Sequence, residues 1–340
     1  MPDSAQYPPV VPGETPPAYL PREEDAPSDA EPGTAEPGTG PSDTAAPQGI
    51  AATGRSTKGE DGRRRKLVYP PAPEPLPVPV VDNHTHLDFR DGLVEVSAAD
   101  ALDAAAAVGV EGVIQVGCDV ESSRWAVQAA NRHPRMLAAV AIHPNDAARS
   151  EAKGTLLAEL AEIDRLAEDP RVRAIGETGL DYFRTGEDGR DAQQASFRAH
   201  LAIAARRGLP VQIHDRDAHD DVIRILDEEG FSGTVVFHCF SGDEDMAELA
   251  HQRGWYLSFG GTSTFKNNDT LRAALGRVDL DHLLVETDAP FLTAVPYRGR
   301  PNAPYLIPLA VRALAEELDV DLAAFCERIR ANTRRVYGDF

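Results

Sequence analysis

From residue 77 to the end of the chain, short apolar segments alternate with longer segments of mixed polarity. The short segments have the length of β-strands, and many are rich in β-branched residues, which favours strands that are buried on both faces. In the longer segments apolar residues recur roughly every three or four positions, as on one face of an amphipathic helix. The predicted strands are 78–81, 112–116, 137–142, 172–175, 210–213, 234–237, 256–259 and 283–285. The predicted helices are 98–108, 122–132, 156–167, 192–207, 218–229, 244–253, 269–277, 305–318 and 321–334.

This alternation predicts a parallel sheet whose strands are joined by right-handed helical crossovers. Eight predicted strands match the strand count of a (β/α)8 barrel, the TIM barrel. A doubly wound open sheet is the alternative, because periodicity alone does not prove that a sheet closes on itself. No G-x-G-x-x-G sequence follows the first strand, which disfavours a nucleotide-binding open sheet.

The residues before this alternation have a different composition. Eighteen of the 27 prolines precede residue 80, mixed with Gly, Ala, Ser, Thr and Glu. Such a segment buries too little apolar surface to offset the entropy of ordering the chain. We therefore predict a disordered, proline-rich N-terminal tail over 1–76 and a folded domain over 77–340.

Composition and charge narrow the class of protein. The formal net charge is −21, which disfavours non-specific binding to duplex nucleic acid unless divalent cations offset the charge locally. The three cysteines lie far apart, which fits a reducing compartment rather than a disulfide framework. We find neither a secretory signal nor an apolar stretch of the ~20 residues that a membrane helix needs. These features predict a cytoplasmic protein without a membrane partner, and we expect a monomer.

Candidate chemistry begins at His84 and His86, which follow the first apolar strand. Side chains two positions apart on a strand point to the same face, so both imidazoles can bind one metal ion. Other predicted strands also end in residues of metal-binding type, namely Glu177, His214, His238 and Asp288. Because the C-terminal ends of barrel strands form one rim, we predict that these six side chains gather there as one metal site.

The ligand types restrict the metal. Four imidazoles and two carboxylates suit Zn²⁺, Mn²⁺, Fe²⁺, Co²⁺ or Ni²⁺, whereas Mg²⁺ alone usually takes more oxygen ligands and water. Six ligands exceed the need of one catalytic ion, so we expect two divalent ions (Zn, Mn, Mg, Co or Ni) that share the carboxylate of Glu177. A metal-bound water would then attack a phosphoryl or acyl centre. Glu177 and Asp288 are the candidate catalytic residues, with Asp288 both a ligand and the acceptor of the proton from that water.

Further residues surround the predicted rim. His143, before Pro144, is either a substrate contact or a plain turn residue. The basic residues expected to bind phosphate are Arg216, Lys266 and Arg298. The aromatic residues that would either stack on unpaired bases or pack in the core are Phe183, Phe240 and Phe265. The acidic residues expected to orient metal-bound histidines are Asp181, Asp215 and Asp217. The histidines expected on the surface are His133, His200, His219, His251 and His282.

Taken in order, the motifs around these residues resemble those of the TatD family of metal-dependent hydrolases, within the amidohydrolase-like barrels. The resemblance runs from about residue 81 to residue 337. The motifs are DNHTHLD at 82–88, AIHP at 141–144, GETGLDY at 176–182, QIHDRDA at 212–218, FHCFSG at 237–242, SFGG at 258–261, ETDAP at 286–290 and RG at 298–299.

This resemblance implies a TIM barrel with a dinuclear site and a nuclease that cleaves phosphodiester bonds, typically a 3'-5' exonuclease on the ends of single-stranded DNA or RNA. By position, His84, His86 and Glu177 would hold one ion. Glu177, His214 and His238 would hold the second, and Asp288 would complete the site. Two other classes stay open: a metal-dependent deacylase or small-molecule phosphodiesterase, and a non-catalytic protein that binds single strands.

Overall fold

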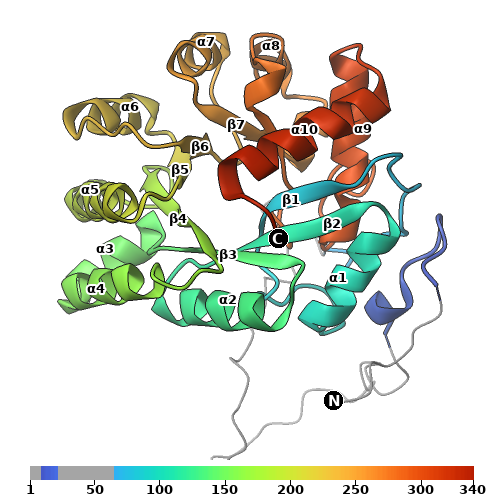
Figure 1. Ribbon diagram of the computed structural model, residues 1–340, viewed down its shortest axis with the longest axis horizontal. Helices are drawn as coiled ribbons and strands as arrows, with labels where there is room; N and C mark the ends of the chain where they lie inside the picture. The colour runs from blue at the N-terminus through green and yellow to red at the C-terminus, as the bar shows by residue number, and fades with distance from the viewer. Residues whose placement is uncertain (1–8, 22–64) are drawn as a thin grey trace, which may run out of the picture.

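Eight parallel strands form the centre of the molecule (Figure 1). The computed structural model describes residues 9–21 and 65–340. The strands are β1 (Val80–Thr85), β2 (Val110–Val116), β3 (Met136–Val140), β4 (Val172–Asp181), β5 (Val211–Arg216), β6 (Val235–Phe237), β7 (Tyr256–Phe259) and β8 (Leu283–Val285). Each strand pairs with the next one in the chain, and a bridge between Thr85 and Ala289 joins β1 to the segment after β8. The predicted (β/α)8 barrel is therefore confirmed, and the open sheet is excluded.

Helices surround the strands, as Figure 1 shows. They are α1 (Ala98–Ala107), α2 (Val120–Arg132), α3 (Pro144–Lys153), α4 (Leu156–Leu166), α5 (Arg190–Arg207), α6 (His219–Glu228), α7 (Glu244–Arg253), α8 (Asp269–Leu275), α9 (Ile307–Glu317) and α10 (Leu322–Tyr337). Helix α3 is absent from the sequence prediction, because its buried side is small and only Pro144, Ala147 and Ser150 are buried. Within the described ranges, no helix combines the length and apolar character needed to cross a membrane.

The strands are apolar because both of their faces are buried. Val113 of β2 belongs to a large cluster shared with the helices, whereas its neighbour Ile114 belongs to a smaller cluster with Leu137 and Leu284. Successive side chains of a strand point to opposite faces, so the smaller cluster fills the barrel interior. Tyr337 of α10 joins this interior cluster, and its hydroxyl accepts a hydrogen bond from Gln212 (2.7 Å).

Two segments of the predicted tail are ordered, and we call residues 9–21 and 65–76 together the N-terminal extension. Its two segments pair through backbone hydrogen bonds between Gly13 and Ala72 and between Ala72 and Glu14, each 2.8 Å. The Tyr19 ring packs against the rings of Tyr69 and Tyr305, with centroids 4.7 and 4.8 Å away. The extension lies beside α1 (Figure 1).

The prediction that all of 1–76 is disordered is therefore wrong for the N-terminal extension. A bidentate ion pair between Arg65 and Asp91 (2.9 and 2.5 Å) fixes its second segment to the loop after β1. Both side chains are almost fully buried, so this pair and the tyrosine rings provide contacts that composition does not reveal. The rest of the predicted tail lies outside the described residues.

His200 is buried in α5, so the prediction of a surface position was wrong for this histidine. Its Nε2 accepts a hydrogen bond from the Ile142 backbone N–H (3.1 Å), and its Nδ1 donates to the Ser196 carbonyl (2.8 Å). Burial lowers the pKa of His200 to about 4. The other four histidines predicted on the surface, His133, His219, His251 and His282, are half-buried or exposed.

This burial predicts a pH-dependent stability. In the unfolded chain His200 regains its ordinary pKa of 6.5, so between pH 6.5 and about 4 the unfolded state binds a proton that the folded state does not. Acidification over this range should lower the free energy of unfolding by about 3 kcal/mol through His200 alone. Urea unfolding of the metal-free protein should show that His200→Gln, although less stable near neutral pH, lacks this part of the acid dependence. His251→Gln, at an exposed position, is the control, and equal pH slopes in the two variants would contradict the prediction.

Candidate metal centre

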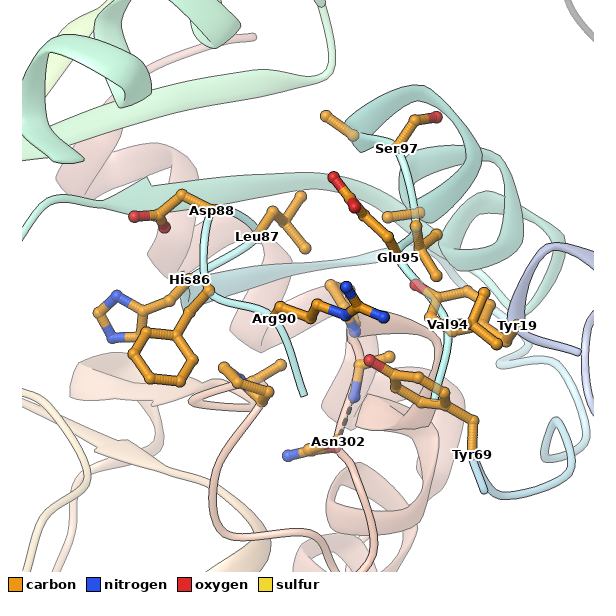
Figure 2. A pocket seen from close by; sticks show the side chains of 18 of the residues that line it. Tyr19, Tyr69, His86, Leu87, Asp88, Arg90, Val94, Glu95, Ser97 and Asn302 are labelled. Carbon is orange, nitrogen blue, oxygen red and sulfur yellow. Dashed lines mark hydrogen bonds between the residues drawn. The ribbon is translucent and has the colours of Figure 1, made fainter. Parts of the chain in front are cut away.

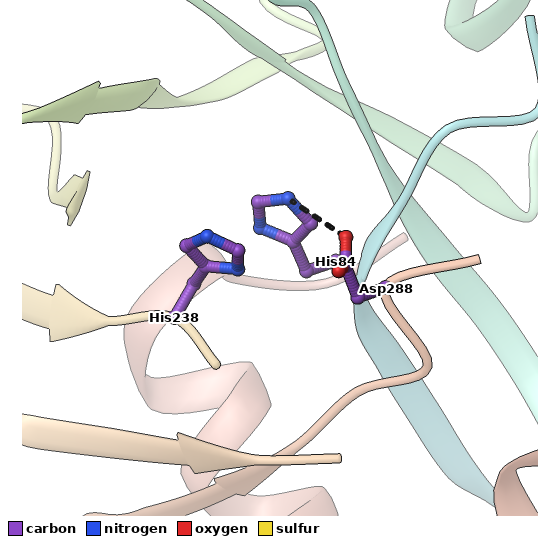
Figure 3. A group of neighbouring side chains, drawn as sticks. All are labelled: His84, His238 and Asp288. Carbon is purple, nitrogen blue, oxygen red and sulfur yellow. Dashed lines mark ion pairs between the residues drawn. The ribbon is translucent and has the colours of Figure 1, made fainter. Parts of the chain in front are cut away.

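The C-terminal ends of five strands bring all six predicted ligands together. His84 and His86 come from the end of β1, and Glu177 comes from β4. His214 lies on β5, and His238 directly follows β6. Asp288 follows β8 and lies beside His84, as Figure 3 shows. Most of these side chains are buried at the rim, with His214 partly exposed.

One group of donor atoms lies on the β1 side of Glu177. The Nε2 atoms of His84 and His86 are 3.2 Å apart, and Glu177 Oε2 lies 3.6 and 3.8 Å from them. Asp288 Oδ1 lies 4.0 Å from His84 Nε2 and 3.6 Å from His86 Nε2. Two nitrogens and two carboxylate oxygens from three strand ends therefore converge on one small volume.

A second group lies on the opposite side of the same carboxylate. Glu177 Oε1 is 2.6 Å from His214 Nδ1 and 2.8 Å from His238 Nε2. These two nitrogens are 3.4 Å apart. Glu177 thus presents one oxygen to each pair of histidines, which is the arrangement expected of a bridging carboxylate.

The outer nitrogens of three of these histidines face acceptors. His86 Nδ1 donates to the Val116 carbonyl (3.0 Å). His214 Nε2 lies 3.3 Å from Asp181 Oδ2, and His238 Nδ1 lies 3.4 Å from Glu286 Oε1. An N–H on each outer nitrogen would leave the inner nitrogen of the ring able to bind a metal ion.

Burial alone would lower the pKa of His238, but Glu177 and then Glu286 hold it well above its usual value, so a proton lies between this ring and Glu177. A divalent cation fits the same position and would replace that proton. His84 supports this assignment, because burial, followed by the charge of His238, lowers its pKa to about 3 and keeps the imidazole neutral. Burial alone would raise the pKa of Glu177, but nearby histidines, led by His238 and His143, hold it well below its usual value. Neutral imidazole and ionised carboxylate are the ligand forms of these groups.

His143 has the opposite pattern. Its Nδ1 accepts a hydrogen bond from the Asn145 backbone N–H (3.1 Å) at the start of α3, so the proton of the neutral ring is on Nε2. Nε2 lies 3.5 Å from Glu177 Oε1. His143 is therefore a helix cap and also a hydrogen-bond donor at the site, and its proton position makes it a poor metal ligand.

Backbone hydrogen bonds join β1 to the segment after β8, where the barrel closes. The Asp288 N–H donates to the His84 carbonyl (2.9 Å), and the His86 N–H donates to the Ala289 carbonyl (2.7 Å). Asp82 accepts from both the backbone and the hydroxyl of Thr287. These bonds fix the position of Asp288 relative to the β1 histidines.

The sequence match agrees with this geometry. The family described as TatD related DNase matches residues 81–338. The chain belongs to the TatD family. It is accordingly a metal-dependent hydrolase, and the predicted resemblance is confirmed.

Relatives across the TatD family share the barrel domain. The chain is 41% identical to an uncharacterized metal-dependent hydrolase TatD of Mycobacterium tuberculosis over 76% of this chain and 98% of that protein. It is 33% identical to the metal-dependent hydrolase YabD of Bacillus subtilis over 75% and 98%. The crystal structure of YjjV, a TatD homologue from Escherichia coli, superposes with a TM-score of 0.69 at 26% identity and covers 76% of this chain and 97% of that one.

Two further contacts of this TatD-family site differ from the sequence prediction. Asp181 contacts His214 as predicted, but Asp215 contacts His219 instead (2.6 Å). Glu286 faces His238, a contact that sequence analysis missed. Glu286 could have been recognised from the sequence, because it directly follows β8 and stands two positions before Asp288.

Among the basic residues predicted to contact substrate, Arg216 ends β5, whereas Lys266 and Arg298 lie on loops after β7 and β8. The guanidinium of Arg216 lies 3.9 Å from the centre of the Phe183 ring, and that of Arg298 lies 4.2 Å from the Phe265 ring. Lys266 is exposed. Phe240 is buried against Phe259, which favours packing over base stacking for this ring.

The contact between Asp181 and His214 predicts a measurable effect on metal affinity. Asp181→Asn should weaken metal binding about 10- to 100-fold, because the carboxylate no longer fixes the proton on His214 Nε2. Isothermal titration of the metal-free protein with Zn²⁺ or Mn²⁺ measures this. Asp215→Asn is the matched control, since Asp215 contacts His219, which is not a candidate ligand. Equal affinities of the two variants would contradict this role of Asp181.

Proposed function

We propose that this protein is a TatD-type nuclease that hydrolyses phosphodiester bonds, as a 3'-5' exonuclease on single-stranded DNA or RNA. The observation that supports this most is the position of Glu177, whose two oxygens face two separate pairs of histidines. Such a donor set suits two divalent ions that share one carboxylate, with His84 and His86 on one side and His214 and His238 on the other.

The ions would bring a water to a pKa near neutrality and offset the charge of a phosphodiester. Asp288, with a side chain that is 12% exposed, would accept the proton removed from that water. His143 Nε2–H points at the same volume and can donate a hydrogen bond to a phosphate oxygen. Arg216 and Arg298 would bind the neighbouring phosphates of the strand.

The acidic charge of the chain also bears on the substrate. A net charge of −21 disfavours a long polyanion on the protein surface, so contact with a strand must be concentrated at the rim. A free end of a single strand satisfies this better than a duplex, because only a few phosphates need to approach the protein.

Substrate class is tested with end-labelled single-stranded DNA, single-stranded RNA and an aminoacyl-tRNA, each incubated with metal-loaded protein. A ladder that shortens one nucleotide at a time from the 3' end is the expected result. Release of the amino acid with an intact RNA would instead favour the deacylase, and binding without turnover would favour the non-catalytic protein.

His214→Ala should lower the rate of hydrolysis by more than about a hundredfold, because it removes a ligand whose partner Glu177 is buried. Circular dichroism should show an unchanged fold. His251→Ala, at an exposed position on α7, is the control and should retain the wild-type rate. Full activity of His214→Ala would exclude the proposed site.

A further inference from the structure

A pocket of about 190 Å³ lies next to the metal centre and shares His86 with it (Figure 2). Its walls come from five parts of the chain: the N-terminal extension, the loop between β1 and α1, helix α1, helix α2 and the segment after β8. At ~10–15 Å³ for each water-sized position, this volume holds roughly 13 to 19 waters, which is room for a small polar ligand. The metal ligands and the pocket are therefore adjacent compartments.

The N-terminal extension supplies a wall of this pocket through Tyr19 and Tyr69. Tyr69 is fixed at both ends, because its hydroxyl donates to the Asp91 carbonyl (2.8 Å) and its carbonyl accepts from Thr15 Oγ1 (3.1 Å). The extension precedes residue 81, where the match to the TatD family begins. This wall is thus built by residues outside the matched family domain.

The chemistry of the lining is mixed. Figure 2 shows the Arg90 side chain across the middle of the pocket, with Glu95 above it and Tyr69 and Asn302 below. No ion pair to Arg90 is formed by any residue in the described ranges, and its side chain is exposed. An arginine without an ion pair binds phosphate through paired N–H donors, and aromatic walls suit a base. Trp125 of α2 adds a second aromatic wall.

We propose that this pocket binds the terminal nucleotide of the strand and that the N-terminal extension stops the strand there. Arg90 binds a phosphate of that nucleotide, Glu95 accepts hydrogen bonds from its base, and Tyr69 and Trp125 enclose the ring. The wall of Tyr19 and Tyr69 leaves room for one nucleotide beyond the metal centre, which limits cleavage to strand ends. This inference deepens the proposed nuclease function and rests on it.

Binding is tested without turnover, by the fluorescence of Trp125. The chain has two tryptophans, so Trp255→Phe leaves Trp125 as the only reporter. Adenosine monophosphate should quench it saturably. In this background Arg90→Ala should weaken the affinity at least about tenfold, as expected for a lost charged hydrogen bond. Arg132→Ala, at an exposed position at the opposite end of α2 from its start at the rim, should leave the affinity unchanged.

Absence of quenching, or equal affinities in Arg90→Ala and Arg132→Ala, would overturn the proposal that this pocket binds a nucleotide.

Linear and circular single-stranded DNA of one sequence test whether the N-terminal extension stops the strand. The expected result is cleavage of the linear strand alone. Cleavage of the circle overturns the inference and the exonuclease part of the proposed function, while phosphodiester hydrolysis stands. If neither strand is cleaved although adenosine monophosphate binds through Arg90, the nuclease function fails and the pocket remains a nucleotide site.

Discussion

The rim of this barrel depends on one carboxylate. Glu177 is buried and ionised, and two pairs of imidazole nitrogens face its two oxygens. A carboxylate and several lone pairs in so small a volume are stable together only if positive charge lies between them. Protonated histidines supply that charge when no cation is bound, and bound metal ions would supply it in the working enzyme. Protons and metal ions therefore compete for the same histidine nitrogens at this centre.

Outer contacts decide which form of each ring is available. Asp181, Glu286 and the Val116 carbonyl face the outer nitrogens of three histidines, while the Asn145 N–H donates to Nδ1 of His143. Histidines of one rim thus differ in the partner of one ring nitrogen, and this partner sets which tautomer each neutral ring favours. The backbone bonds between β1 and the segment after β8 hold this pattern in place, because they fix Asp288 against His84.

Much of this could be predicted from sequence, since strand ends meet at one rim in any barrel and the type of the last residue is visible. His84 and Asp288 were found in this way. The burial of His200 could not be predicted, because its partners Ile142 and Ser196 become neighbours only when α5 packs on the barrel. The order of the N-terminal extension was also hidden, since Tyr19 is stabilised by Tyr305 from the far end of the chain.

The cap formed by His143 has one more consequence. The His143 imidazole caps helix α3 through Nδ1 and also presents its Nε2–H to the metal centre. The start of the helix and the hydrogen bonding at the rim therefore depend on the same tautomer of one ring. If the first turn of α3 frayed, Nδ1 would be released, the ring could switch to its other tautomer, and a hydrogen-bond donor would become an additional ligand. The first turn of α3 would thereby set how many imidazoles the rim can offer to a metal ion.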